Sequence, residues 1–270
     1  MNFNRYLFEY VFLAAVFVLS VAGFWNIYAG EDAAPNGFHH LHVVTNFIWL
    51  SLLLWQLSLI GTNQHATHRK VGLSVLFFGP LLVASAALLS VHSAHKGLVS
   101  GRGDFLIVQN VMVTLELGLL ILLAFVLKKW RKLHGAFLLS TAMLFMGIAL
   151  FFALIGFVPA FRIEGPETFY RFETAATTGR YVCLVVGVLF LVRDPRNGWP
   201  LLLASSFFSV NELIRSFLEA RELIQPLTEF VGSMNPLLAF SGSFAVVLVL
   251  LAATGIRGAR PIASPRQAPA

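Results

Sequence analysis

Long apolar runs separated by short polar breaks follow one another along the chain. The hydrocarbon core of a membrane is about 30 Å thick, so a helix that crosses it needs roughly 20 apolar residues in succession. Because no water is available there, backbone groups must be satisfied within the spanning segment itself, as a helix does. The expected spans are residues 8–29, 38–62, 71–93, 105–127, 134–159, 174–193, 199–219 and 231–255. The sequence therefore predicts an all-α polytopic membrane bundle of about eight transmembrane helices.

The number of spans is seven to eight because the first run has the position of a signal peptide. Its apolar stretch is long and aromatic, and Ile27-Tyr28-Ala29 is a poor small-residue cleavage site, so we keep it as a span. We expect residues 1–257 to form a single bundle. Residues 258–270 are rich in Pro and Ala without a hydrophobic pattern, which predicts a disordered cytoplasmic tail.

Charge is scarce and lies mainly in the breaks. The chain is 57% hydrophobic and 12% charged, which leaves no room for a large soluble domain. Of its 19 Lys and Arg residues, twelve fall in one alternating set of breaks and five in the other, with Arg180 and Arg215 inside spans. This asymmetry is typical of orientation signals, not of nucleic-acid binding. It predicts a membrane protein, in contact with the lipid bilayer, with both termini in the cytoplasm.

The eight histidines divide into two groups at opposite faces of the predicted membrane. A di-iron enzyme with histidine boxes would have to bring the groups together. His42 and His68, however, are about 26 residues apart across a span, or roughly 35–40 Å at the rise of a helix. A metal–nitrogen bond is only about 2 Å long. The inner group, His65, His68 and His134, is therefore expected to anchor helix starts beside basic residues.

The outer histidines are candidate ligands. On a helical wheel His39, His42, Asn46 and Gln56 share one face, whereas His40 points almost the opposite way. The next span ends near His92 and His95, at the same membrane face. Four imidazoles brought together in this way are able to hold a b-type haem or a transition-metal ion. The alternative is that these histidines are solvated interfacial residues.

Several other costly polar side chains lie in the outer halves of the spans. They are Gln109, Glu116, Arg180, Glu212 and Arg215. Charged residues inside a membrane usually pair with one another or line a wet cavity. We therefore expect an outward-facing polar pocket, with the two arginines coupled to Glu116 and Glu212. The alternative is an interhelical ion-pair network with a structural role alone.

The pattern His42, Trp49, Gln56, then His68-Arg69-x-x-Gly72, then His134-Gly135, resembles a functionally uncharacterised family of bacterial multi-pass membrane proteins. The resemblance covers mainly residues 38–150 and implies a location in the bacterial inner membrane. It also implies a distant similarity to cytochrome b561-like electron carriers, whose haems are held by histidines on facing helices.

Three classes of function remain open. The first is a redox or metal-binding membrane protein. The second is a transporter or sensor of a small-molecule ligand, which needs no cofactor. The third is a non-catalytic accessory subunit of a membrane complex. Hydrolysis is least favoured, because the sequence contains no His-Glu-x-x-His motif and no recognisable serine triad.

Overall fold

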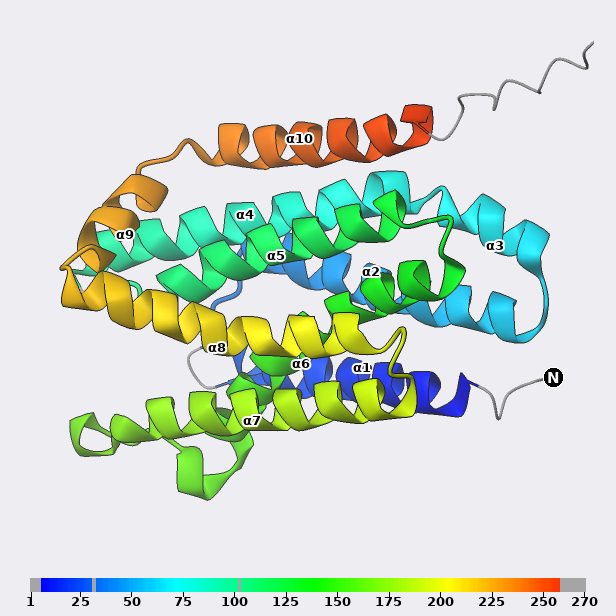
Figure 1. Cartoon of the computed structure of the whole chain (residues 1–270). Coiled ribbons are helices and arrows are strands. Elements are labelled where there is room, and N and C mark those ends of the chain that lie inside the picture. Colours follow the sequence, from blue (N-terminus) through cyan, green and yellow to red (C-terminus); the bar gives the residue numbers. More distant parts are fainter. Residues whose placement is uncertain (1–5, 31–32, 102, 258–270) are drawn as a thin grey trace, which may run out of the picture.

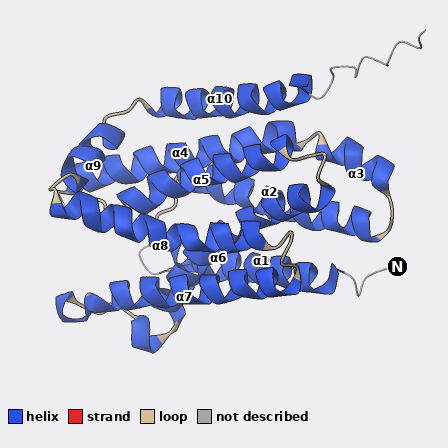
Figure 2. Ribbon diagram, viewed as in Figure 1, coloured by secondary structure: helices blue, strands red, loops and turns tan. Residues whose placement is uncertain are grey.

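The computed structural model describes residues 6–30, 33–101 and 103–257, and these residues form an all-α bundle without β-strands (Figure 2). The predicted tail, residues 258–270, lies outside the described residues. The helices are α1 (Leu7–Ala29), α2 (Gly37–Gly61), α3 (His65–Gly72), α4 (Val75–Ser100), α5 (Ile107–Val126), α6 (Arg131–Phe157), α7 (Tyr170–Arg193), α8 (Trp199–Ala220), α9 (Ile224–Gly232) and α10 (Pro236–Arg257), with short 3₁₀ segments at η2 (Pro159–Phe161) and η3 (Pro166–Thr168). All except α3 and α9 give candidate membrane spans, eight in the described residues. The chain is thus a multi-pass helical membrane protein, as predicted.

Helix α6 lies at the centre of the bundle and packs against α1, α5, α7 and α8. Helix α10 lies at one edge, alongside α4 (Figure 1). The start of α1 and the end of α10 lie at the same end of the bundle, together with α3 (Figure 1). We call this the basic end, because Arg69, Lys70 and Lys128–Lys132 are there. The opposite end is called the cavity end.

The middle of the bundle and the half toward the basic end are filled with apolar side chains. Trp49, Leu50, Phe137 and Leu144 are almost completely buried in one continuous core cluster. The indole Nε1 of Trp49 donates a hydrogen bond to Oγ1 of Thr141, 2.9 Å away, which joins α2 to α6. Trp49 lies one turn from Asn46 toward the basic end, so the apolar cluster begins one helical turn from Asn46.

Close helix contacts depend on small residues. A Cβ atom at Gly23 of α1 would lie 2.8 Å from both Cα and the carbonyl oxygen of Ala149 on α6. Inside a membrane, where burial of apolar surface from lipid gives little driving force, such close backbone approach is a main source of helix association.

The helix bounds differ from the predicted spans by several residues, and two predicted spans include part of a separate short helix. Residues 71–74 do not begin a span, because α3 is a separate short helix and α4 starts at Val75. Residues 231–255 are divided between the end of α9 and α10, and the side chain of Asn235 caps α10 by accepting from the backbone N–H of Leu237 at 2.9 Å. Helix α9 is almost as apolar as α10, and residues 71–74 follow the polar part of α3 without a charge, so hydropathy marks neither boundary.

A polar cavity as the candidate functional site

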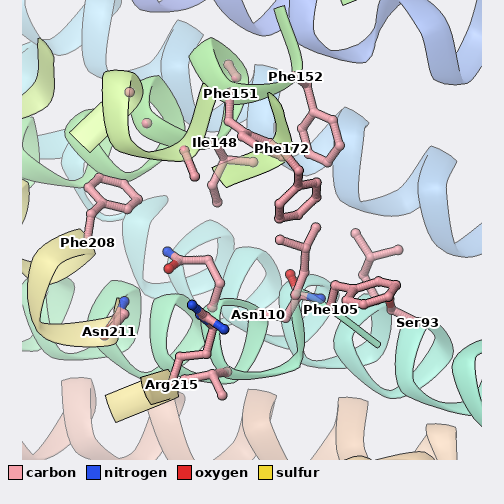
Figure 3. Close-up of a pocket in the computed structure, with 18 of the residues that line it drawn as sticks. Ser93, Phe105, Asn110, Ile148, Phe151, Phe152, Phe172, Phe208, Asn211 and Arg215 are labelled. Atoms are coloured by element: carbon pink, nitrogen blue, oxygen red, sulfur yellow. The ribbon is translucent and has the colours of Figure 1, made fainter. Parts of the chain in front are cut away.

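A cavity of about 580 Å³ occupies the cavity end, between α1, α2, α4, α5, α6, α7 and α8. Much of its wall is aromatic. Figure 3 shows the rings of Phe151, Phe152 and Phe172 opposite the polar side chains of Asn110 and Arg215. The remaining phenylalanines of the wall are Phe24, Phe105, Phe145, Phe169 and Phe208. The site therefore has an apolar wall and a polar wall, which suits a molecule with both kinds of surface.

An ion-pair network lies along the polar wall and connects α7 to α8. Arg180 Nη1 lies 3.0 Å from Glu212 Oε2, and Arg180 Nη2 lies 3.2 Å from Glu173 Oε1. Arg215 reaches Glu212 at 2.6 Å and Glu219 at 2.8 Å. The side chains of Arg180, Glu212 and Arg215 are 18%, 26% and 34% exposed, whereas those of Glu173 and Glu219 are 55% and 63% exposed. The network is therefore partly buried at its centre and open to solvent at its ends. The prediction that Arg180 and Arg215 pair with Glu212 is confirmed.

The predicted coupling of the arginines to Glu116 is wrong. In the described residues Glu116 makes no ion pair, and its Oε2 accepts a hydrogen bond from Nδ2 of Asn211, 3.3 Å away. Glu116 is 5% exposed and does not line the cavity, whereas Asn211, 1% exposed, does. The sequence places Glu116 in the outer half of its span, where the cavity lies. The rotation of α5 about its axis, however, directs the carboxyl group to Asn211 and not into the cavity.

Two of the predicted histidine ligands are joined by an asparagine that the sequence interpretation missed. His39 Nδ1 donates to Oδ1 of Asn36 at 2.8 Å, and Nδ2 of Asn36 donates to Nε2 of His92 at 2.9 Å. The two imidazole rings are 5.7 Å apart between centroids. Asn36 is also the N-cap of α2. An asparagine directly before an apolar helix was the available signal for this residue.

The other outer histidines have separate partners. His42 lines the cavity with Nδ1 3.3 Å from Oγ of Ser85. His95 does not line it, because Nδ1 turns to the carbonyl oxygen of Gly232 on α9, 3.3 Å away. His40 is exposed and lies 3.1 Å from the hydroxyl of Tyr28, so its predicted direction away from the site is confirmed. Across the described residues, no group of three or more His, Cys, Asp or Glu side chains is placed to hold a metal ion.

Gln56 belongs to the basic end and not to the cavity. It shares the helical face of His42 but lies about 21 Å farther along α2 by helical rise. Its side-chain amide faces the carbonyl oxygen of His68 and the backbone N–H of Gly72, and so ties α3 to the bundle. His134 Nδ1 donates to the carbonyl oxygen of Ala124 at 2.8 Å. Burial lowers the pKa of His68, and His134 and His65 nearby lower it further.

Buried polar atoms without partners gather around the cavity. Among the described residues, six buried side-chain nitrogen or oxygen atoms have no hydrogen-bond partner. Four of the six belong to residues that line the cavity, namely Ser20 Oγ, Asn46 Oδ1, Gln109 Nε2 and Asn211 Oδ1. Native proteins leave few such atoms, and each one calls for a partner such as water or a ligand. The sequence could indicate Asn46 and Gln109 as polar residues in spans, but not Ser20.

Fold and site together define a multi-pass helical membrane protein with an aromatic and polar cavity toward one end of the bundle. No family model, curated protein or solved structure matches the chain. The resemblance to the uncharacterised bacterial family and to cytochrome b561-like proteins therefore stays a prediction.

Proposed function

We propose that this protein binds a small amphipathic molecule in the cavity, as a membrane carrier or sensor. The observation that carries the proposal is the set of four unpartnered polar atoms around one cavity. A buried polar group without a partner costs about 1–3 kcal/mol, and a bound molecule with matching groups removes that cost. The phenylalanine wall supplies the complementary apolar surface. A volume of about 580 Å³ lies within the range of roughly 300–1,000 Å³ that is typical of small-molecule sites.

A cavity-blocking variant tests this proposal. Ser93 lines the cavity on α4 (Figure 3), and Ser93→Trp is expected to fill part of it. The probes are farnesol, farnesylamine and farnesoic acid, which share one apolar tail. At least one probe is expected to raise the unfolding temperature of the purified protein and to have no such effect on Ser93→Trp, because a ligand stabilises only the state that binds it.

The matched control for blocking is Val99→Trp, on the exposed surface of the same helix and 76% exposed before substitution. This variant should respond to the probes as the unmodified protein does. Equal responses in all three proteins would indicate partition into detergent, and no response in any would contradict the proposed function.

Haem or metal binding is a second candidate, which the proximity of His39 and His92 favours. A metal there would need further ligands from solvent or a bound molecule, since the described residues offer no group of three. If such a centre exists, we expect His39→Ala and His92→Ala each to abolish the visible absorption or bound metal of the purified protein, because a site with two protein ligands cannot lose one. His40→Ala is the control and should leave both unchanged. Purified protein without absorption or metal above background rejects this candidate.

For orientation, we propose that the basic end faces the cytoplasm of a bacterial inner membrane, in line with the positive-inside rule. Cys183 is the only cysteine and is fully buried, so we expect an introduced surface cysteine to be the one that reacts with a thiol reagent. Glu164→Cys, at the cavity end, should react in intact cells with a membrane-impermeant thiol reagent. Lys129→Cys, at the basic end, should react only after the membrane is permeabilised. The reverse pattern would invert the topology.

A further inference from the structure

We infer that the ligand of the cavity is an uncharged amphiphile whose polar group carries an O–H or N–H donor, and that Asn211 recognises this donor. The inference rests on the proposed function and names the chemical class of the ligand. Three independent features of the cavity lead to it: the balance of its charges, the kind of atom left unpartnered, and the orientation of the Asn211 amide.

The charges that line the cavity cancel. The lining contains three cationic side chains, Lys96, Arg180 and Arg215, and three carboxylates, Glu173, Glu212 and Glu219. Both guanidinium groups already contact carboxylates within the network. A cationic head would have to break these pairs to gain a counter-charge, and an anionic head would meet only Lys96, which enters no ion pair among the described residues. Either head would add a net charge to a lining that is formally neutral, which is costly in such a site. The cavity therefore favours a head without net charge.

The unpartnered atoms are dipolar groups, and two of the four are carbonyl oxygens. These are Oδ1 of Asn46 and Oδ1 of Asn211, in side chains that are 2% and 1% exposed. A carbonyl oxygen only accepts hydrogen bonds, so a ligand satisfies it only by offering a donor. A hydroxyl or an amide N–H does so, whereas an ether or an ester does not. Gln109 Nε2 and Ser20 Oγ offer the same ligand donors in return.

Glu116 fixes which atom of the Asn211 amide is left without a partner. The carboxyl oxygen Oε2 of Glu116 accepts from Nδ2 of Asn211 at 3.3 Å. This hydrogen bond engages the amide nitrogen outside the cavity and leaves Oδ1 as the free atom of a residue that lines it. Glu116 itself does not line the cavity. It is thus a positioning residue. By holding the donor Nδ2 of Asn211, it leaves the acceptor Oδ1 for a ligand.

The test compares farnesol with farnesyl methyl ether, farnesylamine and farnesoic acid, using the unfolding temperature as a function of probe concentration. On the unmodified protein we expect farnesol to bind about fivefold to tenfold more tightly than the ether, the effect of one hydrogen bond. The amine and the acid should bind at least about tenfold more weakly than farnesol. Asn211→Leu should remove the preference for alcohol over ether.

Two substitutions at Glu116 separate positioning from a merely structural role. Glu116→Gln keeps an oxygen that accepts from Asn211, and should keep the preference for alcohol over ether. Glu116→Leu releases the amide, and should reduce that preference while the response to the ether is retained. Ser140→Ala is the control, because this buried serine donates to the carbonyl oxygen of Phe137 and does not line the cavity.

The outcomes are distinguishable. Equal binding of farnesol and its ether would overturn the donor requirement. Equal or tighter binding of the amine or the acid would overturn the uncharged head, while the proposed function would stand. If no probe binds, the proposed function fails and this inference fails with it. The probe series on the unmodified protein decides these points even if a Leu variant does not fold.

Discussion

Arg180→Ala is expected to lower the free energy of unfolding by about 2–4 kcal/mol. Arg180 lies between Glu173 and Glu212, and its removal leaves three carboxylates of the network facing Arg215 alone. Breaking a fully buried ion pair by removing one partner costs several kcal/mol, since the remaining charge loses its compensation. The partial exposure of this network places the expected value toward the lower part of that range. Reversible unfolding in mixed micelles measures it.

Double variants identify the partner of Arg180. Adding Glu212→Gln to Arg180→Ala should recover part of the lost stability, because it removes the uncompensated charge. Adding Glu116→Gln should recover none of it, since Glu116 contacts Asn211 and not an arginine. Recovery by Glu116→Gln and not by Glu212→Gln would contradict the network described above.

Gly23→Leu is expected to destabilise the protein by about 2–3 kcal/mol. Its Cβ atom would meet the backbone of Ala149 at 2.8 Å, and backbone cannot move aside as a flexible side chain can. Helix α1 would have to separate from α6, with loss of packing along the contact. The change is measured by the same unfolding experiment.

The matched control is Gly135→Leu on α6, where a Cβ atom would have no neighbour within 4 Å. Because leucine is also the better helix former, this variant should be as stable as the unmodified protein or more stable by up to about 1 kcal/mol. Equal destabilisation by both substitutions would show that the α1–α6 contact is not the cause.

Part of the site was predictable because it depends on one helix at a time. A helical wheel places His39, His42 and Asn46 on one face of α2, and all three line the cavity. The same wheel also includes Gln56, which the structure places at the basic end. A helical wheel gives the direction of a side chain around the helix and not its position along the helix. It therefore placed Gln56, at the basic end, together with the residues of the cavity.

Contacts between helices escaped prediction for a different reason. His95 follows His92 by three residues, yet it turns to Gly232 because α9 packs on that part of α4. Asn36, the N-cap of α2, also donates to His92, which lies 56 positions away in the sequence. Neither contact has a signature in the local pattern, since each depends on which helices are neighbours.

The sequence by itself determined the class of this protein, its eight candidate spans and the end of the bundle at which polar side chains gather. These properties follow from the cost of exposing polar groups to hydrocarbon, which acts on each segment separately. Only the tertiary structure decided the cavity, the partner of Glu116 and the set of unpartnered atoms around Asn211. These depend on how each helix is rotated and which helix it contacts, and packing of the whole bundle fixes both.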